Sequence, residues 1–112
     1  SKSVKQPIPG LALSNTARAG ILGYAKSLVA DLGAGNITVN VLAPGSTRTA
    51  RLEQLAGDDV EAGLEAMAAN IPLGRVGRPE EFGAAATFLA SERASFVTGV
   101  VLPVDGGEIQ GL

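Results

Sequence analysis

One stretch decides the fold class of this chain: Asn36-Ile37-Thr38-Val39-Asn40-Val41-Leu42-Ala43-Pro44-Gly45. Its first half alternates β-branched apolar residues with polar ones, a pattern typical of a strand with one covered face. Its second half sets Leu42 directly beside Ala43, so we expect both faces of the sheet to be covered there. The Pro44-Gly45 pair is a turn signal. We therefore predict a strand over residues 36–43 that ends at this turn.

A long helix is predicted before this strand, over residues 14–32. Ser14 or Asn15 is suited to cap it, because their side-chain oxygens accept from the free N–H groups of a first helical turn. Gly33 is suited to end it. Apolar residues recur at helical spacing in two stripes, so the helix should be covered from two directions. The stripes are Ala17, Ile21, Tyr24, Leu28 and Leu32, and Leu22, Ala25 and Val29.

The rest of the chain continues the alternation of helices and strands, which favours an α/β fold with parallel strands. Two strands alone do not make a stable sheet, so we expect one partial domain, residues 1–112, that belongs to a larger sheet or pairs with something. The remaining expected segments are a loop over 1–11, a less clear segment over 46–56, a helix over 60–70 capped by Asp58-Asp59, an irregular loop over 71–78, a helix from Pro79 to near Ser91, and a strand over 97–104 ended by Asp105-Gly106-Gly107.

Composition excludes several functions. The 112 residues carry net charge −2, which gives no electrostatic footprint for nucleic acid or an anionic membrane. Cysteine and histidine are both absent, which excludes disulfides, thiolate metal sites and a histidine base. No apolar run reaches the ~18 residues of a membrane span, and no signal peptide is visible, so we expect a cytoplasmic protein. Metal is not expected either, because the acids near residues 58–65 are typical of a solvated helix face.

Three motifs, in order, resemble the short-chain dehydrogenase/reductase family, and most closely the branch of β-ketoacyl carrier-protein reductases. They are the strand 36–45, the loop Ile71-Pro72-Leu73-Gly74-Arg75-Val76-Gly77-Arg78-Pro79-Glu80-Glu81, and the end Phe88-Leu89-Ala90-Ser91, Thr98-Gly99 and Val104-Asp105-Gly106-Gly107. The resemblance implies the C-terminal half of a doubly wound, Rossmann-like parallel-sheet domain that uses NAD or NADP in its full-length form. The glycine-rich G-x-G-x-x-G turn that cradles a dinucleotide pyrophosphate does not occur in this chain.

The family's catalytic tyrosine and lysine are replaced here. Aligning Gly23–Ser27 on the family's long helix puts Ser14 at the tyrosine position and Arg18 at the lysine position. An aliphatic hydroxyl lacks a suitable pKa for that role, and arginine does not deprotonate in proteins. Tyr24 does not restore the motif, because Leu28 follows it at the lysine spacing, and we interpret it as a packing residue.

The resemblance also assigns site residues. The family's catalytic serine falls on Ser1, where it would orient a carbonyl, although a loose chain end is the alternative. The turn after the strand implies cofactor contacts at Pro44, Gly45, Thr47 and Thr49, with the Thr47 backbone meeting the nicotinamide carboxamide; an ordinary Pro-Gly turn is the alternative. Arg75 and Arg78 are expected to pair with Glu80, Glu81 or loop carbonyls.

Two functions follow. The first is part of a nicotinamide-dependent oxidoreductase for a small carbonyl or alcohol substrate, with residues 46–70 as the flap over the substrate. The missing tyrosine predicts atypical chemistry, or no activity of this chain alone. The second is a non-catalytic binding or assembly module that forms a homo-oligomer through the helix 14–32.

Overall fold

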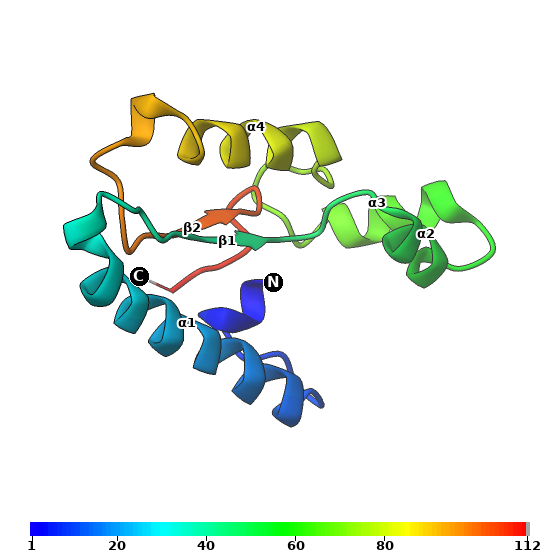
Figure 1. The fold of residues 1–112 in the computed structure, drawn as a ribbon. Helices are drawn as coiled ribbons and strands as arrows, with labels where there is room; N and C mark the ends of the chain where they lie inside the picture. Colours follow the sequence, from blue (N-terminus) through cyan, green and yellow to red (C-terminus); the bar gives the residue numbers. More distant parts are fainter. Residues whose placement is uncertain (112) are drawn as a thin grey trace.

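Two short parallel strands form the centre of the computed structural model, which describes residues 1–111 of the chain. The helix α1 and the short 3-10 helix η1 lie on one face of this sheet, α4 lies on the other, and α2 and α3 extend beyond the end of β1 (Figure 1). The elements in chain order are η1 (Lys2–Val4), α1 (Ala12–Leu32), η2 (Gly33–Gly35), β1 (Val41–Pro44), α2 (Ala50–Ala56), α3 (Val60–Ala68), α4 (Pro79–Leu89), η3 (Glu92–Ala94) and β2 (Val101–Val104).

The sheet confirms the predicted α/β class with parallel pairing. Val41 lies opposite Val101, and the register continues to Pro44 opposite Val104. Both strands are shorter than predicted because, just before β1 begins, the side chain of Asn40 forms hydrogen bonds to the segment that leads into β2. Its amide nitrogen donates to the Val97 carbonyl over 2.8 Å, and its oxygen accepts from the Val100 N–H over 3.2 Å.

The start of α1 differs from the prediction. The helix begins at Ala12, and neither Ser14 nor Asn15 caps it, because both lie inside its first turn. Asn15 instead holds the preceding loop: its oxygen accepts from the Ile8 N–H over 3.2 Å and its nitrogen donates to the Ile8 carbonyl over 2.9 Å. The same side-chain chemistry that suits a cap therefore fixes the loop against the helix.

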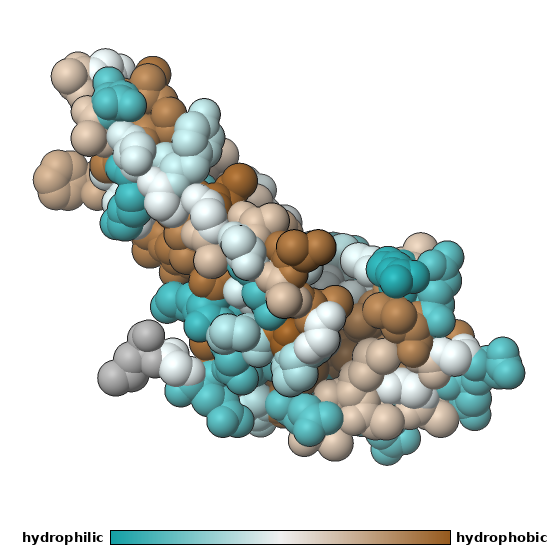
Figure 2. All heavy atoms as spheres, turned by 90° about the horizontal axis from the view of Figure 1, so that it is seen from below, coloured by the Kyte–Doolittle hydropathy of each residue, from teal (hydrophilic) through white to brown (hydrophobic). Residues whose placement is uncertain are grey.

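Only one of the two apolar stripes of α1 faces the sheet. Leu22 and Ala25 border a small hollow that β1 and β2 close from the other side. On the other stripe Leu28 and Leu32 are half-buried, whereas Tyr24 is 63% exposed and Ile21 is 51% exposed. The packing role predicted for Tyr24 is therefore wrong within this chain. Figure 2, seen from the side of α1, shows apolar side chains interspersed with hydrophilic ones along this face.

The later helices agree more closely with the sequence. Asp59 caps α3 by accepting from the Ala62 N–H over 3.1 Å, and Leu64 is buried. Pro79 opens α4 as predicted. The helix α2 was not anticipated within the unclear segment 46–56. None of the helices in residues 1–111 combines the length and apolar character that crossing a bilayer requires.

Candidate functional site

The turn after β1 lies at the carboxyl edge of the sheet, where ligands of open α/β sheets gather. Pro44 ends the strand, and the Gly45 N–H donates to the Val104 carbonyl of β2 over 3.1 Å. A Cβ atom added at Gly45 would lie 2.5 Å from Cβ of Asp105. Glycine is therefore required at this position, because the turns after the two strands touch.

A second segment, the loop 71–78, holds the turn from the other side. The Gly77 N–H donates to the Ser46 carbonyl over 2.9 Å, and the Gly77 carbonyl accepts from the Arg48 N–H over 2.8 Å. Thr47 lies between these two bonds, as the centre of a parallel bridge to Gly77. Its own N–H therefore points away from Gly77, and it has no acceptor among residues 1–111. Within residues 1–111, the turn 45–49 thus leaves two backbone donors without an acceptor, the N–H groups of Thr47 and Thr49, and the bonds on either side of Thr47 fix the first of them.

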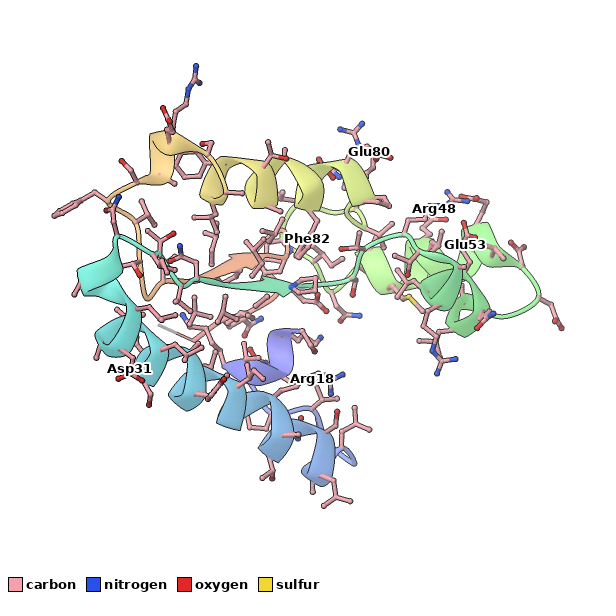
Figure 3. The ribbon with its side chains drawn as sticks, viewed as in Figure 1. Arg18, Asp31, Arg48, Glu53, Glu80 and Phe82 are labelled. Carbon is pink, nitrogen blue, oxygen red and sulfur yellow. The ribbon has the colours of Figure 1, made fainter. Side chains whose placement is uncertain are left out.

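Thr49 forms the N-cap of the next helix, α2. Its hydroxyl oxygen caps α2 by accepting from the Leu52 N–H over 3.3 Å, which leaves the hydroxyl hydrogen to donate elsewhere. Between the two threonines, Arg48 donates to Glu53 of α2 over 2.8 Å and to Glu61 of α3 over 2.6 Å. Arg48 and Glu53 lie together at the base of this helix pair in Figure 3. The turn therefore fixes both helices of the predicted flap.

Ser1 lies beside the same edge. Its hydroxyl oxygen caps η1 by accepting from the Ser3 N–H over 3.3 Å and from the Ser3 hydroxyl over 3.2 Å. Arg18 extends from α1 toward η1 in Figure 3. The structure therefore places Arg18 near the segment that carries Ser1.

Glu108 belongs to this site and was missed by the sequence analysis. Its carboxylate is 7% exposed and forms an ion pair with Lys2 over 2.5 Å. It also accepts from the Ser46 N–H over 2.9 Å and from the Ser46 hydroxyl over 3.2 Å. No sequence signal marked it, because an acid shortly after a glycine pair resembles a surface residue.

A cleft of about 130 Å³ lies between the turn and the start of α4. Ser46 and Thr47 line one side, and Phe82, which Figure 3 shows directed from α4 toward the strands, lines another. Arg75 and Glu81 also line the cleft and are joined by two hydrogen bonds of 2.6 and 2.9 Å. Arg75 holds the pKa of Glu81 well down, at about 2.

The predicted pairing of the loop arginines is confirmed with Glu81 as the partner. Besides Arg75, the Arg78 guanidinium lies 3.5 Å from the Glu81 carboxylate, and the Arg78 N–H donates to it over 2.8 Å. Within residues 1–111, no three acidic side chains gather in a way that could hold a metal ion. Both arginines at this cleft therefore share the one carboxylate of Glu81.

Comparison with known proteins agrees with this geometry. Residues 1–108 match the family model described as Enoyl-(Acyl carrier protein) reductase. A 3-oxoacyl-(acyl-carrier-protein) reductase of Chlamydia muridarum is 44% identical over 99 residues, which cover 88% of this chain and 38% of the relative. A 3α-hydroxysteroid dehydrogenase of Mediterraneibacter gnavus is 51% identical over 84 residues, 75% of this chain and 32% of the relative.

A solved structure shares the fold. L-sorbose reductase from Gluconobacter frateurii, complexed with NADPH and L-sorbose, superposes with a TM-score of 0.92 at 30% identity, over 98% of this chain and 45% of that one. This chain thus spans less than half the length of these proteins. The predicted part of a Rossmann-like domain and the likeness to β-ketoacyl carrier-protein reductases are confirmed. Sequence and fold agree, and the chain belongs to the short-chain dehydrogenase/reductase family.

Proposed function

We propose that the gene product carrying this chain is a nicotinamide-dependent oxidoreductase that interconverts carbonyl and alcohol groups on a small molecule. The observation that carries the proposal is the unpaired Thr47 N–H at the carboxyl edge of the parallel strands. A nicotinamide carboxamide offers the oxygen acceptor that this donor lacks. The relatives support the same chemistry, since they are reductases and dehydrogenases, and the L-sorbose reductase structure contains NADPH.

The residues of the turn fit such a cofactor. The bonds on either side of Thr47 hold its N–H in place, so only a small part of the binding free energy is spent on ordering the turn further. The Thr49 hydroxyl keeps a hydrogen to donate to the amide or pyrophosphate, while Pro44 and Gly45 set the path of the backbone. When bound, NAD or NADP supplies the hydride chemistry, and these residues bind and orient it.

The substrate side of the proposal is atypical. Ser1 orients the substrate carbonyl by hydrogen bonding, with the Arg18 guanidinium nearby to stabilise negative charge on its oxygen. Ser14 stands where the family carries its proton-donating tyrosine, and an aliphatic hydroxyl is a poor acid. We therefore propose altered chemistry in the gene product, and no turnover by residues 1–112 alone.

Restoring the family's pair tests this proposal. The double substitution Ser14→Tyr with Arg18→Lys supplies a phenol and a lysine at the matching positions. General acid–base groups contribute roughly a hundredfold or more, so we expect carbonyl reduction with NADPH to rise by at least about tenfold over the unsubstituted protein. The single substitutions are matched controls and should gain less. No gain in the double variant, with cofactor binding intact, would contradict the proposal that the rest of the site is competent.

A second candidate function, assembly, is favoured by the outer stripe of α1. Leu13 is 89% exposed, and Ile21 and Tyr24 lie on the same side of the helix. An apolar stripe of this kind fits a second copy of the chain, so we propose a homo-oligomer through α1. The assembly role is compatible with the enzyme and would remain if turnover were absent. Cytoplasmic localisation stays a prediction.

A further inference from the structure

Glu108 joins three segments that are far apart in the sequence. Its carboxylate binds Lys2, which follows Ser1, and Ser46, which precedes Thr47. The segment after β2 that carries Glu108 thereby connects the turn after β1 with η1. A carboxylate this buried is costly unless it is paired and hydrogen-bonded, and here the ammonium and both Ser46 donors satisfy it.

The backbone around Glu108 is fixed, so its carboxylate has a set direction. Asp105 accepts from the Gly107 N–H and from the Ile109 N–H, both over 2.9 Å, and so brackets Glu108 on either side. The Glu108 carboxylate lies directly against the turn, since a Cβ atom added at Gly45 would come within 2.7 Å of it. The position of Glu108 therefore fixes the peptide that leads into Thr47.

We propose that Glu108 is a positioning residue, which orients the Thr47 donor through Ser46 and transmits cofactor binding to the Ser1 segment through Lys2. This inference rests on the proposed function, because the ligand of the turn is the nicotinamide cofactor. Cofactor binding at Thr47 reduces the motion of the turn. The Ser46–Glu108 hydrogen bonds pass this reduction in motion to the Glu108 carboxylate, and the ion pair with Lys2 passes it on to η1. Glu108 touches neither substrate nor cofactor.

Substitutions can separate the two parts of this role, the link to Ser46 and the link to Lys2. Glu108→Ala removes both links. Glu108→Gln keeps an oxygen acceptor for the Ser46 N–H but loses the charge that holds Lys2, and Lys2→Met removes only that ion pair. Glu92→Ala is the matched control, because Glu92 is an exposed acid on η3, apart from the site.

The experiment measures amide hydrogen exchange of the gene product with and without NADPH, together with the dissociation constant for NADPH. Losing a hydrogen bond to a charged group should speed exchange at Ser46, and weaken NADPH binding, by about tenfold or more in Glu108→Ala. In Glu108→Gln and Lys2→Met, the dissociation constant should change by less than about threefold. In these two variants NADPH should still protect the turn but no longer protect Lys5 and Gln6, whose N–H groups donate to the Lys2 carbonyl in η1.

The outcomes distinguish the two proposals. A protein that binds neither NADPH nor NADH saturably overturns the proposed function, and this is measured before any variant is made. Saturable binding with unchanged affinity and unchanged Ser46 exchange in Glu108→Ala would overturn the positioning role alone. Continued protection of Lys5 and Gln6 in Lys2→Met would also overturn it, since the ion pair would then transmit nothing.

Discussion

At the scale of single residues, Gly45 is a position where the fold leaves no room for a side chain. Its backbone passes so close to Asp105 that a methyl group would lie 2.5 Å from Cβ and 2.7 Å from Cα of that residue. Gly45→Ala should therefore lower the free energy of unfolding by about 1–3 kcal/mol, measured by urea denaturation. Gly77→Ala is the matched control, since its nearest atoms are 3.6 Å away, and it should change stability by less than about 1 kcal/mol. Equal effects would contradict the close approach.

The ion pair of Glu81 predicts that the stability of the fold depends on pH. The pKa of Glu81 falls from 4.5 to about 2 in the folded protein, mainly through the hydrogen bond from Arg75. Because the pKa of Glu81 is lower in the folded state than in the unfolded state, its ion pair contributes its full stabilisation of the fold above about pH 4.5. This stabilisation is lost as the pH falls toward about 2. NMR titration of the Glu81 carboxyl carbon should give a midpoint near 2, and Arg75→Met should raise it. A midpoint near 4.5 in the unsubstituted protein would show that the pair does not persist in solution.

At the scale of elements, the end of α2 lies against the first turn of α3. A Cβ atom added at Gly63 would overlap the Ala56 carbonyl oxygen, so the two helices are in backbone contact. Gly63→Ala should separate them and cost about 1–3 kcal/mol of stability. Gly83→Ala, in α4 with open space around it, should instead stabilise by about 0.5–1 kcal/mol, because alanine favours the helix. Thermal unfolding measures both changes in stability, and a Gly63→Ala variant of unchanged stability would contradict this close contact.

Elements with a strong periodic signal were predictable, and those set by distant contacts were not. Pro79 and the acids after it marked the start of α4, and Asp59 marked the start of α3. The length of β1 was overestimated because Asn40 bonds across to Val97 and Val100, which no local pattern reveals. Glu108 was missed for the same reason, since its partners lie far away in the sequence. The Pro44-Gly45 pair predicted the turn itself, whereas the cofactor contacts proposed for it came only from the resemblance to a family.

At the scale of the whole molecule, α1 predicts self-association. Ile21→Glu combined with Tyr24→Glu places two charges on the exposed stripe, where burial against a second copy would leave them unpaired. Light scattering after size exclusion should show an oligomer for the unsubstituted gene product and a smaller species for this double variant. Ala30→Glu, exposed but off the stripe, is the control and should leave the mass unchanged. A monomeric unsubstituted protein would contradict the assembly role.

The central claim is that the turn after β1 binds the nicotinamide end of a dinucleotide. The most direct measurement follows the Thr47 amide resonance of the complete gene product during titration with NADPH and with NADH. The proposal predicts a saturable downfield shift at Thr47 and slower exchange of its hydrogen, with Thr87 on the exposed side of α4 unchanged. A Thr47 resonance that does not move at saturating cofactor would contradict it.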